Sequence, residues 1–255
     1  FPEPVRELAE FCGQHRISLM YDGAHVLGLI AGREFQDPLE EGALLITAST
    51  HKTFFGSQRG LILSNAGENE WRKIDKGAFP GSSSNHHLDT LVALAIATYE
   101  MMELGQGYAR QTIANAKILG ARLYETGFKV QAAEFGFTQS HQLAIDVSEF
   151  GGGDEVARHL KDNNIILNMN LLPFESLDQV TNPAGIRLGT QEMTRFGMKE
   201  AEMEMIARLF KKCLIEGKYV GDEVTGFRKN FQKINYSFDD FTSPKILPLI
   251  EEAQT

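Results

Sequence analysis

Two stretches of the sequence, ISLMYDGAH at residues 17–25 and LLITASTHKT at residues 44–53, decide the fold that we expect. Each contains an apolar run of strand length and ends in polar residues. Before the first stretch, apolar residues recur at helical spacing through residues 4–16, so a helix should lead directly into a strand. Short, nearly all-apolar strands are typical of a sheet that is covered on both faces. These features predict an α/β fold.

Polar residues gather where each of these two strands should end. Asp22 and His25 follow the first strand, and Thr50, His51 and Lys52 follow the second. In doubly wound sheets, ligands bind outside the carboxyl ends of the strands, so these side chains are positioned to face one ligand. A simpler interpretation stays open, in which Asp22 caps a helix and Lys52 is a surface charge.

A carboxylate and a lysine at adjacent strand ends fit the chemistry of pyridoxal phosphate. This cofactor forms a Schiff base with a lysine, and a partly desolvated lysine near another cation, here His51, is a suitable nucleophile. The cofactor also needs a partner at its pyridine nitrogen, which Asp22 would supply. We expect Ser49 and Thr50 to hydrogen-bond cofactor oxygens, and residues 56–60 to form a turn with room for a phosphate or for a loop of a partner.

The pattern of the chain changes at the Gly-Gln-Gly sequence of residues 105–107. Periodicity predicts a helix on each side of this break, at 89–103 and 108–126. The charged residues around Trp71 are expected to form an exposed hairpin or loop. Beyond the break it predicts strands and helices in the order of an α+β domain, namely strands at 128–132, 143–147, 165–168 and 185–188, helices at 154–163 and 199–216, and one more helix after Val220. We therefore expect part of a large α/β domain at residues 1–105 and a smaller α+β domain at residues 106–255.

Composition places the chain among ordinary globular proteins. Its 255 residues carry 25 basic and 34 acidic side chains, and the net charge of −9 disfavours nucleic acid and anionic lipid as partners. Cys12 and Cys213 cannot build a disulfide framework, and no set of metal ligands has suitable spacing. No apolar run reaches the length of a membrane span. A cytoplasmic protein without a metal site is expected.

Together with later motifs, the two strand ends resemble serine hydroxymethyltransferase, a fold-type I pyridoxal phosphate enzyme. The likeness extends from about Ile17 to about Gly197 and rests on DGAHVLGLIAG at 22–32, TASTHKT at 47–53, FPG at 79–81, TQSH at 138–141, NMN at 168–170 and GIRLGT at 185–190. It implies the carboxyl-terminal part of an aminotransferase-like large domain, followed by a small domain. Because that family keeps further site residues upstream of these motifs, we expect this chain to be inactive alone.

The resemblance assigns a role to each motif residue. Lys52 would be the Schiff-base lysine, Asp22 the partner of the pyridine nitrogen, and His25 a neighbour of the cofactor's phenolic oxygen. Thr50 and His51 would line the cofactor beside Lys52. Arg187 would bind the carboxylate of the amino acid, for which the rigid two-donor fork of a guanidinium is well suited.

The chain departs from the family pattern in several places. Where the family has a Gly-Gly-rich stretch that reaches the phosphate of a neighbouring subunit, this chain has Ser82 and Ser83, whose hydroxyl and N–H groups would donate instead. A two-fold homodimer is therefore expected. Met169 stands where the family often has lysine, which bears on contacts to the pterin.

The function implied by the resemblance is the interconversion of serine and glycine, with transfer of the one-carbon unit to a reduced pterin, either tetrahydrofolate or a methanopterin. Two alternatives stay open. One is another fold-type I enzyme, either a class V aminotransferase or a cysteine desulfurase, although Cys213 lies in a helical stripe and not on the mobile loop that a desulfurase needs. The other is a scaffold that retains the fold without catalysis.

Overall fold

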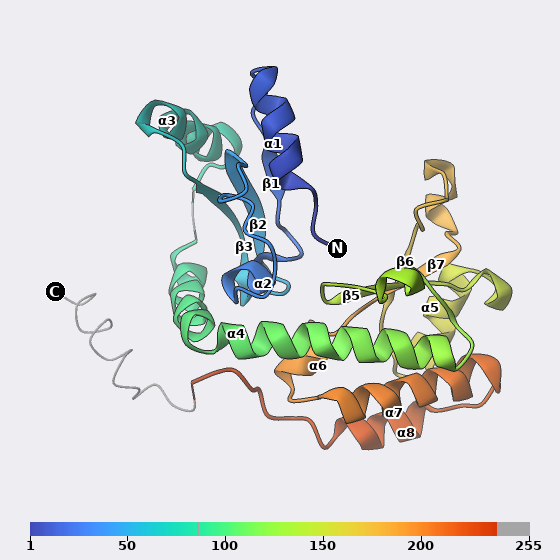
Figure 1. The fold of residues 1–255 in the computed structure, drawn as a ribbon. Coiled ribbons are helices and arrows are strands. Elements are labelled where there is room, and N and C mark those ends of the chain that lie inside the picture. The colour runs from blue at the N-terminus through green and yellow to red at the C-terminus, as the bar shows by residue number, and fades with distance from the viewer. Residues whose placement is uncertain (86, 239–255) are drawn as a thin grey trace. The chain divides into compact units, whose positions relative to one another are not determined.

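The computed structural model describes residues 1–85 and 87–238, which form two compact units (Figure 1). The amino-terminal unit comprises Pro2–Ala109 together with residues 236–238. The carboxyl-terminal unit comprises Arg110–Asn235 together with Phe1. The proline-containing end of the chain lies outside the described residues. That residues 1–105 and 106–255 are parts of a large and a small enzyme domain stays a prediction.

A three-stranded sheet in the order β1-β2-β3 organises the amino-terminal unit. β1 (Met20–Asp22) pairs in parallel with β2 (Leu45–His51), which pairs antiparallel with β3 (Phe55–Ser64). The unit also contains α1 (Val5–Gln14), α2 (Leu27–Ala31), α3 (Glu68–Lys76), a π-helical segment (Gly77–Ser82) and the first part of α4 (Leu88–Glu125). The parallel pairing of β1 with β2 confirms that their carboxyl ends lie at one edge of the sheet.

Apolar residues from α2, β2 and α4 form the core of the amino-terminal unit. Ile46 and Ala48 on β2 belong to one buried cluster with Leu27 of α2 and Met101 of α4. Tyr108, near the end of the unit's share of α4, is fully buried, and its ring packs edge-on against Phe55 and Tyr236. Burial of this apolar surface holds α2 and α4 on the sheet and fixes the turn between β1 and α2.

The expected helix break at residues 105–107 is wrong, because α4 continues without interruption from Leu88 to Glu125. At Gly105 the helix packs against the end of α2, where Gly32 provides the room. A Cβ atom added to Gly32, at the end of α2, would lie 2.6 Å from the carbonyl oxygen of Gly105.

The expected charged loop around Trp71 is also wrong, because residues 68–76 form helix α3. Glu68 and Glu70 lie in its first turn and Lys73 and Lys76 in its last turn, where they complement the helix dipole. Glu68 also forms an exposed ion pair with Arg72, one turn later, at 2.6 Å. These charges favour a surface helix. It was not predicted, because helices were predicted from an apolar stripe, which this segment lacks.

The carboxyl-terminal unit contains a four-stranded sheet in the order β4-β5-β7-β6, with antiparallel neighbours throughout. Its strands are β4 (Lys129–Val130), β5 (Gln142–Asp146), β6 (Asn168–Asn170) and β7 (Gly185–Gly189). Its helices are α5 (Gly153–Asp162), α6 (Gln191–Arg195), α7 (Glu200–Phe210), the π-helical segment Lys211–Ile215 and α8 (Gly221–Arg228), with short 3-10 turns at Ala133–Phe135, Ser148–Phe150 and Leu177–Thr181. The strands expected at 128–132, 143–147 and 185–188 are confirmed, whereas the strand expected at 165–168 lies too early, because β6 begins only at Asn168.

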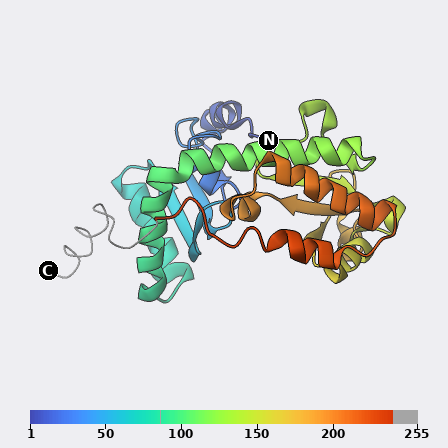
Figure 2. The ribbon, with the colours of Figure 1, turned by 90° about the horizontal axis from the view of Figure 1, so that it is seen from below.

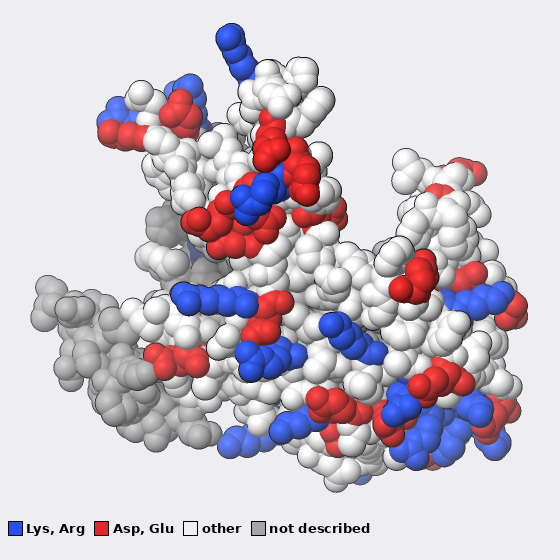
Figure 3. Space-filling model, in the orientation of Figure 1, with Lys and Arg blue, Asp and Glu red and all other residues white. Residues whose placement is uncertain are grey.

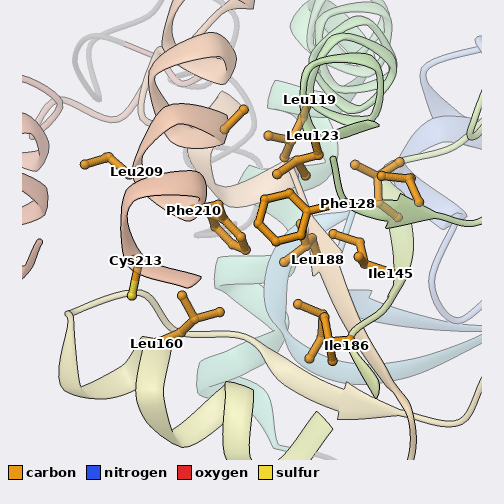
Figure 4. Close-up of a cluster of buried hydrophobic side chains, with 14 of the residues drawn as sticks. Leu119, Leu123, Phe128, Ile145, Leu160, Ile186, Leu188, Leu209, Phe210 and Cys213 are labelled. Carbon is orange, nitrogen blue, oxygen red and sulfur yellow. The ribbon is translucent and has the colours of Figure 1, made fainter. Parts of the chain in front are cut away.

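One face of this second sheet is buried under helices. The side chains of Leu143 and Ile145 on β5 and of Ile186 and Leu188 on β7 join a core with residues of α4, α5 and α7 (Figure 4). Figure 2 shows α7 and α8 together on one side of these strands. Because successive side chains of a strand point to opposite faces, Arg187 projects from the other face.

Candidate functional site

The ends of β1 and β2 form the first part of the candidate site. Asp22 closes β1 and is in register with Thr47 of β2, and the N–H of Gly23 donates to the carbonyl oxygen of Thr47 at 2.7 Å. β2 continues to His51, and Lys52 follows it directly. The expected gathering of Asp22, His25 and Lys52 at one edge of the sheet therefore has a structural basis in the parallel pairing.

Thr53 fastens the end of β2 to the turn before α2. Its buried hydroxyl donates to the carbonyl oxygen of His25 at 2.7 Å and accepts from the N–H of Gly28 at 3.0 Å. The approach is so close that a Cβ atom on Gly28 would lie 2.2 Å from the Thr53 carbonyl group. Thr53 thus holds the backbone at the end of β2 against the backbone of the turn between β1 and α2. The place of Thr53 in the TASTHKT motif gave no indication of this role.

Replacement of Gly28 by alanine is expected to destabilise the protein by about 1 to 3 kcal/mol, because the added methyl group overlaps backbone that cannot move without breaking the Thr53 bonds. Gly13→Ala is the matched control, since nothing lies within 4 Å of a Cβ atom added there, near the end of α1. Urea unfolding of both variants and the parent measures the difference. Equal stability of the two variants would contradict this account of the turn.

Lys52 lies half-buried beside this turn. Its Nζ donates to the Ser49 hydroxyl at 3.0 Å, and within the described part of the chain no carboxylate forms an ion pair with it. His51 is exposed and His25 is half-buried. The amine of Lys52 is therefore held by a neutral hydroxyl, which leaves it available to another group.

Asp22 presents its carboxylate at the same edge. One oxygen, Oδ1, accepts from the N–H of Ala24 at 3.0 Å, which orients the exposed side chain. Among the described residues, the second oxygen has no hydrogen-bond partner. The pKa of the adjacent Tyr21 phenol is raised to about 12. Burial is the main cause, and the carboxylates of Glu3, Glu41 and Asp22 add to it. The edge of the sheet therefore carries an oriented carboxylate with one oxygen available.

Thr50 performs a structural task in this part of the chain. It is fully buried, and its hydroxyl donates to the Ser57 carbonyl oxygen at 2.6 Å and accepts from the Arg59 N–H at 3.1 Å. These bonds exist because residues 56–60 belong to β3, so the expectation of a turn with room for a phosphate is wrong. Arg59 binds the start of α4, through the His87 carbonyl oxygen and the Thr90 hydroxyl. A role of Thr50 toward the cofactor stays a prediction.

Ser82 and Ser83 lie at the end of the π-helical segment and are exposed. The Ser82 hydroxyl donates to the Gly77 carbonyl oxygen at 2.8 Å, and the Ser83 hydroxyl donates to the Ala78 carbonyl oxygen at 2.7 Å. Both hydroxyl protons thus close the local turn. Their role at the phosphate of another subunit stays a prediction.

Arg187 occupies the middle of β7 in the carboxyl-terminal unit. Its register partners are Ala144 on β5 and Asn168 on β6. Its Nε donates to the Asn168 Oδ1 at 3.3 Å, and within residues 1–85 and 87–238 no carboxylate forms an ion pair with it. A half-buried cation without an acidic partner is suited to bind an anionic ligand.

Both ends of β7 are held firmly. Before the strand, the Glu175 carboxylate accepts from the N–H groups of Leu172 and Ala184, at 2.8 and 2.7 Å. After it, the buried hydroxyl of Thr190 donates to the Thr112 carbonyl oxygen of α4 at 2.9 Å. These bonds fix the backbone from which Arg187 projects. Sequence patterns do not reveal them, because the partners of Thr190 are distant along the chain.

Other groups that carry chemistry lie elsewhere. A cavity of about 360 Å3, lined in part by Cys12 and Leu44, lies at the amino end of β2, away from Lys52. Burial raises the pKa of the Cys213 thiol, which disfavours the reactive thiolate. No group of three or more potential metal ligands comes together among the described residues, and no helix in that part is long and apolar enough to cross a membrane.

Acidic and basic side chains are interspersed on the face drawn in Figure 3.

Comparison with known proteins supplies an independent line of evidence. The family model described as serine hydroxymethyltransferase matches residues 3–210. Similar curated proteins include the serine hydroxymethyltransferases of Methanosphaera stadtmanae, 49% identical over 94% of this chain and 56% of the relative, and of Archaeoglobus fulgidus, 50% identical over 94% of this chain and 55% of the relative. The chain therefore spans about half the length of the curated relatives that it matches.

A solved structure agrees with this similarity. The L-threonine transaldolase of Pseudomonas fluorescens, determined in its internal aldimine state, matches 98% of this chain and 57% of its own length, with 30% identity and a TM-score of 0.86. The expected fold class, an α/β fold corresponding to part of a fold-type I enzyme, is confirmed by this match and by the two mixed α/β units.

Proposed function

Because this chain belongs to the serine hydroxymethyltransferase family, we propose that it takes part in the pyridoxal phosphate-dependent interconversion of serine and glycine, with a reduced pterin as the partner in one-carbon transfer. The observation that carries the proposal is the placement of Asp22 and Lys52 at the carboxyl ends of two neighbouring parallel strands. That edge is where α/β sheets bind their ligands.

The residues at this edge fit the cofactor. The Lys52 amine, bonded only to a neutral hydroxyl, would hold the pyridoxal aldehyde carbon covalently. The available oxygen of Asp22 would accept the pyridinium N–H, and its negative charge would keep that nitrogen protonated. His25 would lie beside the phenolic oxygen, and Thr50 and His51 would line the cofactor. When bound, pyridoxal phosphate supplies an electron sink for the bonds around the amino acid's Cα.

The remaining residues would act on the substrate and on assembly. Arg187 would bind the substrate carboxylate and so orient the bond to be broken. Ser82 and Ser83 would contact the phosphate bound by a second subunit, in exchange for the local hydrogen bonds that their hydroxyl groups and the Ser83 N–H make. We accordingly propose a homodimer, and a cytoplasmic location among its amino-acid substrates.

The proposal is tested with the natural full-length polypeptide, supplied with pyridoxal phosphate, serine and either tetrahydrofolate or tetrahydromethanopterin. Glycine is expected to form in amounts that depend on the pterin, and comparison of the two pterins identifies the acceptor. Formation of pyridoxamine phosphate would instead indicate an aminotransferase, and release of sulfur from cysteine a desulfurase. Protein that stays colourless with the cofactor would favour a scaffold.

A further inference from the structure

We infer that Asn168 is a positioning residue, which holds Arg187 by its Nε atom and leaves the outer edge of the guanidinium, formed by Nη1 and Nη2, for the substrate carboxylate. The inference deepens the proposed function and rests on the assignment of Arg187 as the carboxylate-binding residue. It concerns the carboxyl-terminal unit alone.

The strand register places Asn168 beside Arg187. The two residues are direct partners in the β6–β7 ladder, so their side chains project from the same face of the sheet. The partner on the other side, Ala144 of β5, has no polar side-chain atom. Ile186 and Leu188, the neighbours of Arg187 along β7, point to the buried face. Asn168 is therefore the polar residue that the ladder sets directly against the arginine.

The orientation of the Asn168 amide follows from its second hydrogen bond. Its Nδ2 donates to the carbonyl oxygen of Met169 at 3.0 Å. Its Oδ1 is then the atom that faces Arg187, whose Nε lies 3.3 Å away. The opposite orientation would place amide and guanidinium N–H groups against one another, because arginine has no acceptor.

A hydrogen bond at Nε determines which edge of the guanidinium is left to bind the substrate carboxylate. Arginine can offer a carboxylate either the edge with Nε or the edge with Nη1 and Nη2. Among the described residues, neither Nη atom has a hydrogen-bond partner. A neutral amide is suited to orient the Arg187 side chain, because it does not cancel the positive charge that attracts the carboxylate.

The contact itself is tested by NMR on the full-length protein with 15N-labelled arginine. The Nε–Hε signal of Arg187, identified by its loss in Arg187→Lys, is expected to exchange with water about two- to tenfold faster in Asn168→Ala, the range that corresponds to one net hydrogen bond. Sodium acetate, compared with sodium chloride at equal ionic strength, should perturb the Nη signals more than Nε. Unchanged exchange in Asn168→Ala, or a response to acetate confined to Nε, would overturn the inference.

The consequence for the ligand is tested by Asn168→Asp in the protein loaded with pyridoxal phosphate. The new carboxylate would pair with the guanidinium and repel the substrate, so serine affinity should fall about tenfold or more. Affinity for serinamide, which lacks the carboxylate, should not fall. Asn182→Asp, which adds the same charge in the β6–β7 loop, is the control and should leave both affinities unchanged.

The possible results separate this inference from the function on which it rests. Unchanged serine affinity in Asn168→Asp, or equal losses for serine and serinamide, would overturn the positioning role, since a purely structural role affects both ligands alike. A parent protein that binds no serine, with faster Nε–Hε exchange in Asn168→Ala, would contradict the proposed function and still support the contact.

Discussion

Alanine in place of Lys52 is expected to leave the protein unable to hold pyridoxal phosphate covalently. The visible absorbance of the lysine-bound cofactor should disappear, and glycine formation from serine should be lost, because the substitution removes the amine that donates to Ser49. The measurement is an absorbance spectrum of the full-length variant after incubation with the cofactor and removal of the excess.

The controls for this result are two lysines of α3 in the same unit. Lys73 and Lys76 lie in the last turn of that helix, where they complement its dipole. Alanine at either position should leave the absorbance band and the activity in place. A Lys52→Ala protein that keeps the band would show that another amine holds the cofactor.

Lysine in place of Arg187 should weaken serine binding by about one to two decades. The charge is kept, but the two-donor fork is lost, and a charge-assisted hydrogen bond contributes about 1.5 to 3 kcal/mol. Turnover should fall as well, since the same contact orients the bond to be broken. Separate titrations of serine and of the pterin in the full-length protein distinguish this pattern from a general defect.

The matched control for Arg187→Lys is Arg158→Lys in the same unit. Arg158 forms an exposed ion pair with Asp154 within α5, so its replacement should change neither affinity nor turnover. If Arg187→Lys binds serine as tightly as the parent and only the apparent affinity for the pterin changes, the assignment of Arg187 to the carboxylate is wrong.

Elements with a clear apolar period were predictable from the sequence. β2, β7, α5 and α7 lie within a few residues of their expected positions, because burial dictates alternating or helical apolar spacing. Helix α3 was missed because charges, and not an apolar face, favour it. The continuity of α4 was missed because a glycine inside a helix and a glycine that ends a helix look alike in one sequence.

The candidate site was predictable only in part. The parallel strands bring Asp22 and Lys52 to one edge, as the apolar runs before them indicated. The hydrogen bonds that hold the edge were not foreseen. Thr53 acts on His25 and Gly28 across an interval of more than twenty residues, and Asn168 meets Arg187 only through the register of β6 with β7. Such partners depend on tertiary pairing, which local patterns do not encode.

Covalent trapping identifies the lysine that holds the cofactor, which we assign as Lys52. Borohydride reduction of the full-length protein loaded with pyridoxal phosphate makes the covalent attachment permanent, and mass spectrometry of the peptides then locates it. The label is expected on the peptide that contains Lys52. A label on Lys73, on Lys76 or on any other lysine would contradict this assignment.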